Sequence, residues 1–335
     1  MELNQVEQEV KYYFDKIQSL KEEISKVVVG QHEVIDQVII AFLAGGHALI
    51  EGVPGLAKTL LIKTLSDAIE ADYHRIQFTP DLMPSDIIGT EVLEEDHVSG
   101  KKVFVFNKGP VFSNILLADE INRTPPKTQA ALLEAMQERE VTYAGTTYPM
   151  KKPFFILATQ NPVEQAGTFP LPEAQLDRFL LYININYPTE QEEREVLKMT
   201  TSSKNAQVTP VISGDEIVKL QSLVREIHIS DDLIEYVNKI VRSTRPKTTN
   251  VELVKNGVQW GAGPRAGQAM ILTAKARAVT HSRLSVTKED IVEVAYPVLR
   301  HRILMNYKSM AEGTKADDVT KHLLHQIDIP LNGIT

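Results

Sequence analysis

One short segment limits the fold of this chain more than any other, and it reads Gly52-Val53-Pro54-Gly55-Leu56-Ala57-Lys58-Thr59. It follows the apolar run Leu49-Ile50 and precedes the helical run Leu60–Ile69, so we expect a strand, a loop and a helix in that order. A loop entering a helix N-terminus offers converging N–H donors, and glycines let the backbone approach a phosphate without a Cβ in the way. The segment therefore predicts an α/β fold with a phosphate-binding loop.

Each position of this loop has an expected role. Lys58 is placed to neutralise the β- and γ-phosphates, and the Thr59 hydroxyl is placed to bind Mg²⁺. Ala57 stands where the strict pattern has a second glycine; because this position should already be entering the helix, we expect a negative φ and a small cost. The alternative is a strand-to-helix turn with a solvated Lys58, and the strand–loop–helix context favours phosphate binding. The predicted nucleotide-binding residues are Gly52, Val53, Pro54, Gly55, Leu56, Ala57, Lys58, Thr59 and Leu60.

A second informative segment is Ile115-Leu116-Leu117-Ala118-Asp119-Glu120, an apolar strand that ends in two carboxylates. The alternation of a strand sends these two side chains to different places. Asp119 could face the Mg²⁺ bound by Thr59, while Glu120 could act as general base toward the attacking water. Alone, an acidic strand end is common and usually structural. Together with the phosphate loop it indicates a nucleoside triphosphatase.

The chain up to Pro188 alternates short apolar runs with helical stretches, which is typical of a parallel sheet covered on both faces. Two hairpins interrupt this pattern: one runs from Thr90 to Phe106 and turns at Ser99-Gly100, and the other runs from Val141 to Met150 and turns near Gly145. The expected strands are His47–Glu51, His74–Phe78, Ile115–Asp119, Phe154–Thr159 and Leu180–Ile185.

Helical patterns flank this region. Apolar residues spaced for one helix face predict an N-terminal helix over residues 1–25, followed by a second helix from Gln31 to Ala44. After Pro188 we expect helices opened by capping boxes at Thr189, Ser213 and Thr287, with a flexible connection over Thr200–Pro210. The predicted domains are an N-terminal helix (1–25), a nucleotide-binding α/β core (26–188) and a helical domain (189–335).

Composition limits the classes of function. The 335 residues carry a net charge of -8, which does not favour nucleic acid or anionic membranes, and they include no cysteine. The longest apolar run, Val38–Ala44, is too short to span a bilayer, and the N-terminus shows no signal peptide. We therefore expect a soluble, cytoplasmic protein.

A series of further motifs resembles the MoxR family of AAA+ ATPases, in which an alanine at position 57 is usual. The resemblance covers residues 25–190 densely and continues more thinly to the end. It implies a five-stranded parallel sheet, a small all-helical lid, one hairpin inserted in the second helix and one before the fourth strand. Besides the phosphate loop, the motifs are Thr79–Asp86, Gly109–Phe112, Asp119–Lys127, Ala158–Pro162 and Leu171–Phe179.

The same resemblance implies two roles in catalysis. Asn161 matches the sensor-1 residue, which would hold the attacking water or the γ-phosphate; the alternative is an Asn-Pro turn. Arg178 matches the arginine finger, which stabilises charge on the transferring phosphoryl group. Without the family, Arg178 would be an ion-pair partner of Asp177 or Glu173. A finger works in trans, which implies a homo-oligomeric ring and, for this fold, a hexamer.

Other assignments are less constrained. Arg265, in Gly263-Pro264-Arg265-Ala266, resembles sensor 2, and Pro264 suits the first turn of a helix. A surface arginine is the equal alternative, and the sequence leaves open whether Arg265 would serve its own site or a neighbour's. Val29 and Gly30, in Val28-Val29-Gly30-Gln31, resemble the segment that contacts adenine through backbone groups. Arg300-His301-Arg302 is interpreted as a solvated or intersubunit basic patch.

The resemblance implies an ATPase that uses ATP and Mg²⁺ for chaperone-like remodelling or maturation of protein complexes. Its partners would be a protein client and a protein with a von Willebrand factor A domain. One alternative is a nucleic-acid motor, because related helicases carry the same hairpins; the acidic balance and the lack of a basic stripe with interleaved aromatic residues argue against it. Another is a nucleotide-gated scaffold, against which the presence of Glu120, Asn161 and Arg178 argues.

Overall fold

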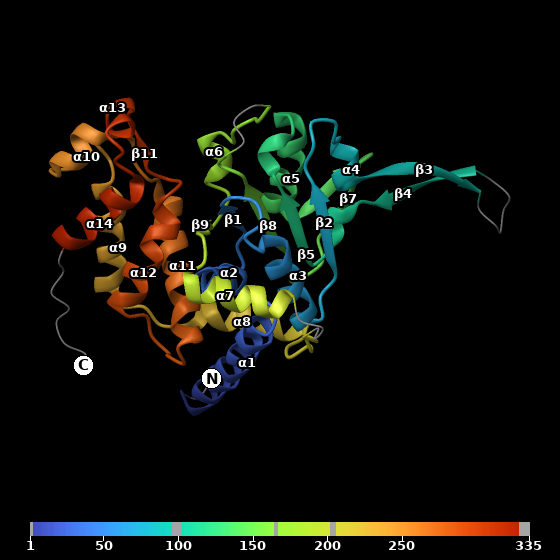
Figure 1. The fold of residues 1–335 in the computed structure, drawn as a ribbon, viewed down its shortest axis with the longest axis horizontal. Helices are drawn as coiled ribbons and strands as arrows, with labels where there is room; N and C mark the ends of the chain where they lie inside the picture. Colours follow the sequence, from blue (N-terminus) through green and yellow to red (C-terminus); the bar gives the residue numbers. More distant parts are fainter. Residues whose placement is uncertain (1–2, 96–101, 164–166, 202–205, 328–335) are drawn as a thin grey trace.

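The computed structural model describes residues 3–95, 102–163, 167–201 and 206–327. Its centre is a five-stranded parallel sheet with the strand order β2-β5-β8-β1-β9 (Figure 1). Each strand lies within one residue, at both ends, of a strand predicted from the sequence. The bounds are β1 Ala48–Glu51, β2 Tyr73–Gln77, β5 Ile115–Asp119, β8 Phe155–Gln160 and β9 Leu181–Asn184.

The strands β5, β8, β1 and β9 are largely apolar on both faces, which is why they read as apolar runs, whereas the edge strand β2 buries only Ile76. In β5, Ile115 and Leu117 pack into one cluster of buried residues, while Leu116 and Ala118 pack into another. Alternate side chains of a strand point to opposite faces, so each strand supplies both clusters. The core is therefore a three-layer sandwich, with α1, α2 and α3 on one side and α5 on the other.

The helices of this core follow the predicted pattern. The N-terminal helix buries Val10, Ile17 and Ile24 of the stripe expected from the sequence, and it also buries Tyr13 and Leu20. The second predicted helix starts after Gln31 and buries most of its length. The bounds are α1 Leu3–Ser25, α2 His32–Leu43, α3 Lys58–Ile69, α4 Pro84–Ile88, η1 Pro110–Phe112, η2 Ile121–Arg123, α5 Pro126–Glu138 and α6 Glu173–Leu176.

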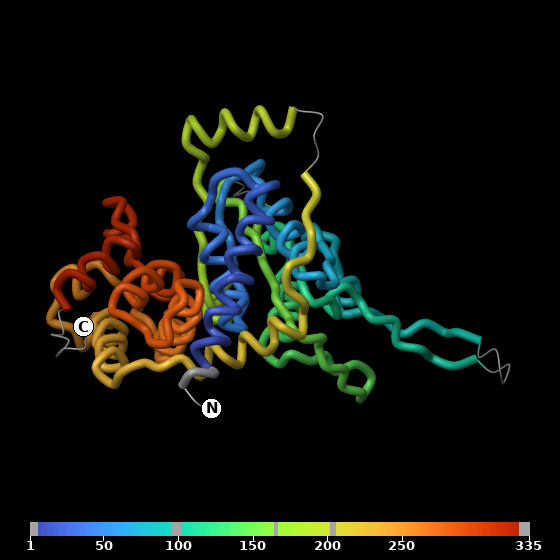
Figure 2. The backbone as a smooth tube through the Cα atoms, turned by 90° about the horizontal axis from the view of Figure 1, so that it is seen from below, coloured from blue at the N-terminus to red at the C-terminus, as the bar shows by residue number. Residues whose placement is uncertain are grey.

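Two antiparallel hairpins are inserted as the resemblance implied. Strands β3 (Gly89–Glu95) and β4 (Lys102–Lys108) follow α4 and project from the body (Figure 2), whereas β6 (Glu140–Tyr143) and β7 (Thr146–Pro149) precede β8. The predicted turn at Ser99-Gly100 lies outside the described residues. Phe106 lies 4.9 Å from the ring of Tyr143 and 4.6 Å from that of Tyr148, so an aromatic cluster joins the two hairpins.

The C-terminal region is helical, and the predicted capping boxes at Thr189, Ser213 and Thr287 are confirmed. It also contains a two-stranded antiparallel sheet of β10 and β11, which the sequence analysis did not anticipate. Within the described residues no helix is both long and apolar enough to cross a bilayer. The bounds are α7 Glu190–Thr200, α8 Gly214–Glu226, α9 Asp231–Ser243, α10 Glu252–Gly257, β10 Val258–Trp260, α11 Pro264–Thr280, α12 Lys288–Leu299, β11 Leu304–Met305, α13 Tyr307–Ala311 and α14 Ala316–Gln326.

Candidate active site

The phosphate loop begins where β1 ends, and two of its glycines are required by the backbone. A Cβ on Gly52 would lie 2.1 Å from Ile185 Cγ2, which is closer than real Cβ contacts allow. Gly55 has a φ of 86°, in the left-handed region that side chains disfavour, and the space around it is open. The Gly52 N–H donates to Gln160 O at 3.3 Å, so the loop is anchored to the end of β8.

Ala57 departs from the expectation. Its φ is 58° and its ψ is 20°, so the negative φ predicted for it is wrong. The helix begins at Lys58, two residues before the predicted run Leu60–Ile69, and Ala57 is the residue at which the loop turns into the helix. A non-glycine residue in the left-handed conformation costs about 1–2 kcal/mol. The exposed alanine thus carries local strain that a glycine would relieve.

Lys58 points back into the loop that carries it. Its Nζ donates to Gly52 O at 2.6 Å, and the residue is 9% exposed. Burial lowers the pKa of Lys58, while the nearby carboxylates of Asp119, Glu120 and Glu51 act in the opposite direction. A positive charge therefore lies inside the loop, facing the acidic end of β5.

Asp119 is held by two donors. Its Oδ1 accepts from Thr159 Oγ1 at 2.6 Å, and its Oδ2 accepts from Arg75 Nη2 at 2.6 Å and from Arg75 Nε at 3.2 Å. Within the described residues these three bonds do not fill the roughly four lone-pair sites of a carboxylate. Asp119 is thus fixed in orientation and retains capacity to bind a water or a cation, which fits Mg²⁺, an ion that prefers oxygen ligands.

Glu120 leaves the strand in a left-handed conformation, with a φ of 57°. Its N–H donates to Thr159 Oγ1 at 2.8 Å, so one hydroxyl fixes both acidic residues. Glu120 Oε2 accepts from Gln77 Nε2 at 2.8 Å and from Arg123 Nη1 at 2.9 Å. The two carboxylates are therefore oriented separately, but by the turn at Glu120, which lies outside the strand, and not by the strand alternation that was expected.

Asn161 forms the turn that one of its two interpretations predicts, and its role as sensor 1 stays a prediction. Its Oδ1 accepts from the Val163 N–H at 3.1 Å, which is an Asx turn of the kind expected before proline. Its Nδ2 is buried and finds no partner within the described part of the chain, although the residue is only 4% exposed. A buried donor without a partner costs about 1–3 kcal/mol. A phosphate oxygen or water would remove that cost, so the site fits a triphosphate.

Arg178 and Arg265 lie on a different face. Arg178, between α6 and β9, donates from Nη1 to Leu133 O at 2.8 Å, and within the described part of the chain it forms no ion pair with Asp177 or Glu173. Arg265 lies in the first turn of α11, half exposed, with Nη1 3.7 Å from Asp177 Oδ2. Both line a cavity of about 230 Å³ that also receives Arg139 and Arg302 and to which no residue from 52 to 59 contributes. We call this the finger face.

The segment predicted to contact adenine is tied to the chain that follows β9. Gly30 has a φ of 68°, and a Cβ there would lie 2.5 Å from Glu192 Oε1 of α7. Gln31 Nε2 donates to Asn186 O at 2.8 Å. The backbone of Val29 and Gly30 is thus placed between α1 and α7, with no side chain at position 30 to fill the space.

Sequence reasoning missed Arg75, Gln77 and Thr159, which orient the two carboxylates. The signal was present in β2, because Arg75 and Gln77 alternate with the buried Ile76 at the end of a strand. Gln77 is paired in register with Asp119, so the polar face of β2 lies beside the acidic end of β5. That β2 and β5 are neighbours is known only from the order of the strands in the sheet.

Comparison with known proteins places this geometry in a family. Residues 47–181 match the family described as "ATPase family associated with various cellular activities (AAA)", and residues 251–323 match the AAA lid domain. The chain is 41% identical over 310 residues to Chaperone MoxR1 of Mycobacterium tuberculosis, a match that covers 92% of this chain and 81% of that protein. The chain belongs to the MoxR family of AAA+ ATPases.

Other MoxR-family matches agree. Protein MoxR of Methylorubrum extorquens is 30% identical over 308 residues, covering 87% of this chain and 88% of that protein. A crystal structure from Cytophaga hutchinsonii, provisionally described as an ATPase, superposes with a TM-score of 0.90 at 44% identity and covers 98% of this chain and 99% of its own. The predicted MoxR resemblance and the predicted fold are confirmed, and the protein is an ATPase by family.

Proposed function

We propose that this MoxR-family ATPase cleaves ATP at sites shared between neighbouring copies in a ring, and that the ring is a hexamer. One observation carries this proposal. Lys58, Asp119, Glu120 and Asn161 gather at one edge of the sheet, which we call the nucleotide edge, whereas Arg178 lies on the finger face. An arginine that completes the site would therefore come from the next copy.

The residues of the nucleotide edge divide the work of binding and chemistry. The backbone N–H groups of residues 52–60, except Pro54, which has none, and the Lys58 ammonium bind the phosphates, with Val29 and Gly30 beside the adenine. Thr59 and Asp119 would hold Mg²⁺, which supplies positive charge to the phosphoryl oxygens. Glu120 takes the proton of the attacking water, and Asn161 Nδ2 donates to that water or to the γ-phosphate.

Two residues of the finger face act on the neighbour's site in this proposal. Arg178 stabilises the charge that spreads over the transferring phosphoryl oxygens. Arg265 shares its cavity and is half exposed, so it is placed to reach the same phosphate from the same side. We therefore propose that Arg265 serves the neighbouring site rather than its own.

We propose that the free energy of ATP hydrolysis drives chaperone-like remodelling or maturation of protein complexes in the cytoplasm. The name of the Mycobacterium tuberculosis relative and the family resemblance support this role, and the resemblance also suggests a partner with a von Willebrand factor A domain. The β3–β4 hairpin adds a structural argument, because Phe104 is 70% exposed and Leu93, directly opposite it, is 53% exposed. Such apolar surface suits contact with another protein.

Mixed rings test the shared site. Arg178→Ala subunits keep a complete nucleotide edge, and Lys58→Ala subunits keep Arg178. Each alone is expected to lose turnover, and mixing them is expected to restore part of it, because Lys58→Ala subunits lend Arg178 to intact sites. Absence of rescue in rings shown to contain both subunits would remove the trans finger.

The protein client can be identified with the Glu120→Gln variant, which should bind ATP without cleaving it. Affinity capture in the presence of ATP is expected to retain a client or partner that capture with ADP releases. The matched control is Glu120→Gln with Phe104→Ser, which is expected to lose a client held by the hairpin. Equal capture with both nucleotides would argue against a client bound in the ATP state.

A further inference from the structure

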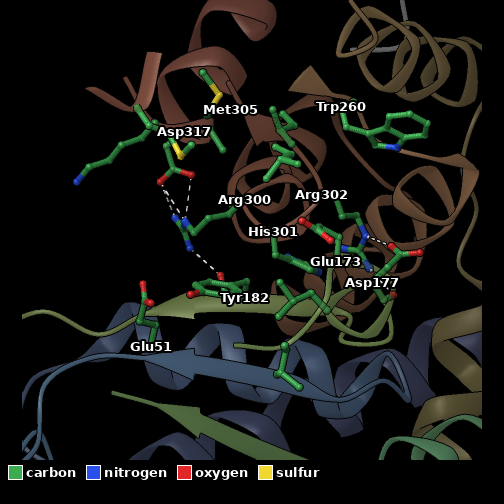
Figure 3. A pocket seen from close by; sticks show the side chains of 18 of the residues that line it. Glu51, Glu173, Asp177, Tyr182, Trp260, Arg300, His301, Arg302, Met305 and Asp317 are labelled. Atoms are coloured by element: carbon green, nitrogen blue, oxygen red, sulfur yellow. Dashed lines mark hydrogen bonds and ion pairs between the residues drawn. The ribbon is translucent and has the colours of Figure 1, made fainter. Parts of the chain in front are cut away.

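The tripeptide Arg300-His301-Arg302 is not a solvated basic patch, as its sequence suggested. It lies between α12 and β11, beside a cavity of about 750 Å³ between the C-terminal region and the core (Figure 3). The Arg302 side chain is only 4% exposed, and all three side chains turn toward the start of β9. Each of them donates to a main-chain carbonyl between Asp177 and Tyr182. We call this tripeptide the lid clasp.

Arg302 makes the largest set of these bonds. Its Nε donates to Asp177 Oδ1 at 2.7 Å. Its Nη1 donates to Leu180 O at 3.2 Å and to Val298 O at 2.6 Å, and its Nη2 donates to Phe179 O at 2.8 Å and to Asp177 O at 3.4 Å. All five N–H groups of the guanidinium are thus used. A buried cation satisfied in this way cannot leave its partners without remaining uncompensated.

Arg300 and His301 extend the same attachment. Arg300 Nη1 donates to Tyr182 O at 2.7 Å, while its Nε and Nη2 bond Asp317 of α14 at 3.0 Å and 2.9 Å. His301 Nε2 bonds Phe179 O at 3.1 Å, and its ring stacks on Tyr182 with 5.8 Å between ring centroids. The C-terminal region and the start of β9 are therefore joined at several points.

The segment gripped by the lid clasp is the one that carries the finger. Arg178 lies between Asp177 and Phe179, whose carbonyl groups both accept from Arg302. The segment continues into β9, where Tyr182 is paired in register with Leu49 of β1. Since β1 ends at the phosphate loop, the clasped segment connects the C-terminal region, the finger and the strand that leads to the subunit's own nucleotide.

We propose that the lid clasp is a positioning device that fixes Arg178 relative to the neighbouring site. Because Arg300-His301-Arg302 holds the finger segment through its backbone, a movement of the C-terminal region carries Arg178 with it. The position of one subunit's lid then governs hydrolysis in the next subunit. This inference rests on the proposed trans action of Arg178.

A directional version of the mixed ring tests the clasp. The parent mixture combines Arg178→Ala subunits, which provide the site, with Lys58→Ala subunits, which provide the finger. Arg302→Gln is added to one or the other. On the finger subunit it is expected to reduce the rescued turnover by about 10²-fold, the loss that follows a misplacement of about 1 Å. On the site subunit it is expected to leave the rescue close to that of the parent mixture, since that subunit lends no finger.

The matched control is Arg242→Gln, which removes an exposed arginine from α9 of the same region and should leave the rescue unchanged on either side. Assembly and thermal unfolding are recorded for each mixture. If Arg302→Gln subunits do not assemble, His301→Phe replaces it, because it removes the bond to Phe179 O and keeps a ring beside Tyr182. A loss of rescued turnover when the finger subunit carries His301→Phe supports the clasp.

Two results would overturn the proposal, and they have different consequences for the trans finger. Equal losses on both sides, or no loss on the finger side, would show that the clasp only stabilises the fold, while the trans finger would stand. Absence of rescue in the parent mixture would remove the trans finger itself, and the clasp would lose its proposed role with it.

Discussion

The nucleotide edge and the finger face differ in the charged side chains that they carry. At the nucleotide edge, Lys58 lies among the carboxylates of Asp119, Glu120 and Glu51, so charges of both signs alternate around a loop of N–H donors. On the finger face four arginines surround a cavity to which Asp177 brings the acidic charge. At the nucleotide edge Arg75 and Arg123 are already bonded to the two carboxylates, whereas on the finger face several arginines share the single carboxylate of Asp177. In our proposal each surface is half of a site, and the two halves are joined when two copies meet.

The largest expected effect comes from the finger face. Arg178→Ala is predicted to lower kcat by about 10³- to 10⁵-fold, the range for arginine fingers. Equilibrium binding of ATP should change little, because the arginine is absent from its own subunit's nucleotide edge. Steady-state turnover and ATP titration of the same preparation check this, with Arg242→Ala as the exposed control. A loss of affinity with little loss of kcat would break the division between the two surfaces.

The next effect comes from the nucleotide edge. Glu120→Gln is predicted to lower turnover by about 10²- to 10⁴-fold, the contribution of a general base. ATP binding should persist, because glutamine keeps the size and the acceptor atom that Gln77 and Arg123 contact. The control is Glu134→Gln, an exposed carboxylate on α5. Full activity of Glu120→Gln would remove this residue as the base.

The smallest expected effect is a loss of stability at acidic pH that comes from His47, a residue lining the cavity of the finger face. Burial, helped by the nearby Arg139, lowers the pKa of His47 to about 3, while Nδ1 accepts from the Ile156 N–H at 3.0 Å. The unfolded chain takes up a proton at His47 near pH 6.5 and the folded chain does not, so stability falls as pH drops below 6.5. From pH 7 to pH 5 the free energy of unfolding should fall by about 2 kcal/mol from this residue.

Urea unfolding of the wild type and of His47→Asn at both pH values measures this contribution. Asparagine can accept from Ile156 in place of Nδ1 and does not titrate, so the variant should lose about 2 kcal/mol less than the wild type over the same interval. An identical pH dependence in both proteins would contradict the assignment. His301 is shifted in the same direction and contributes to both proteins alike.

Motifs made of contiguous residues could be predicted from the sequence. The phosphate loop and the Asp119-Glu120 pair each require neighbours in the chain, and the five apolar runs became the five strands. The φ of Ala57 could not be predicted, because it depends on where the helix begins. The roles of Arg75 and Thr159 could not be predicted either, because they join residues about 40 positions apart through the order of strands.

The lid clasp is a stronger example of contacts that could not be predicted from the sequence. In sequence Arg300-His301-Arg302 is a polar tripeptide, for which a solvated patch is the ordinary interpretation. Its burial depends on main-chain carbonyls more than 100 positions earlier in the chain. Those carbonyls become acceptors only once the C-terminal region docks beside β9. Long-range docking, which no local pattern encodes, therefore decides what this tripeptide does.

The most direct measurement is a structure of the assembled Glu120→Gln protein with ATP and Mg²⁺. The γ-phosphate is expected to contact Lys58 of one copy and the guanidinium of Arg178 from the next, with Asp119 and Thr59 beside the magnesium ion. A nucleotide bound elsewhere, or a γ-phosphate at Lys58 with every Arg178 still on Leu133 O and no neighbouring arginine in reach, would contradict a site shared between copies.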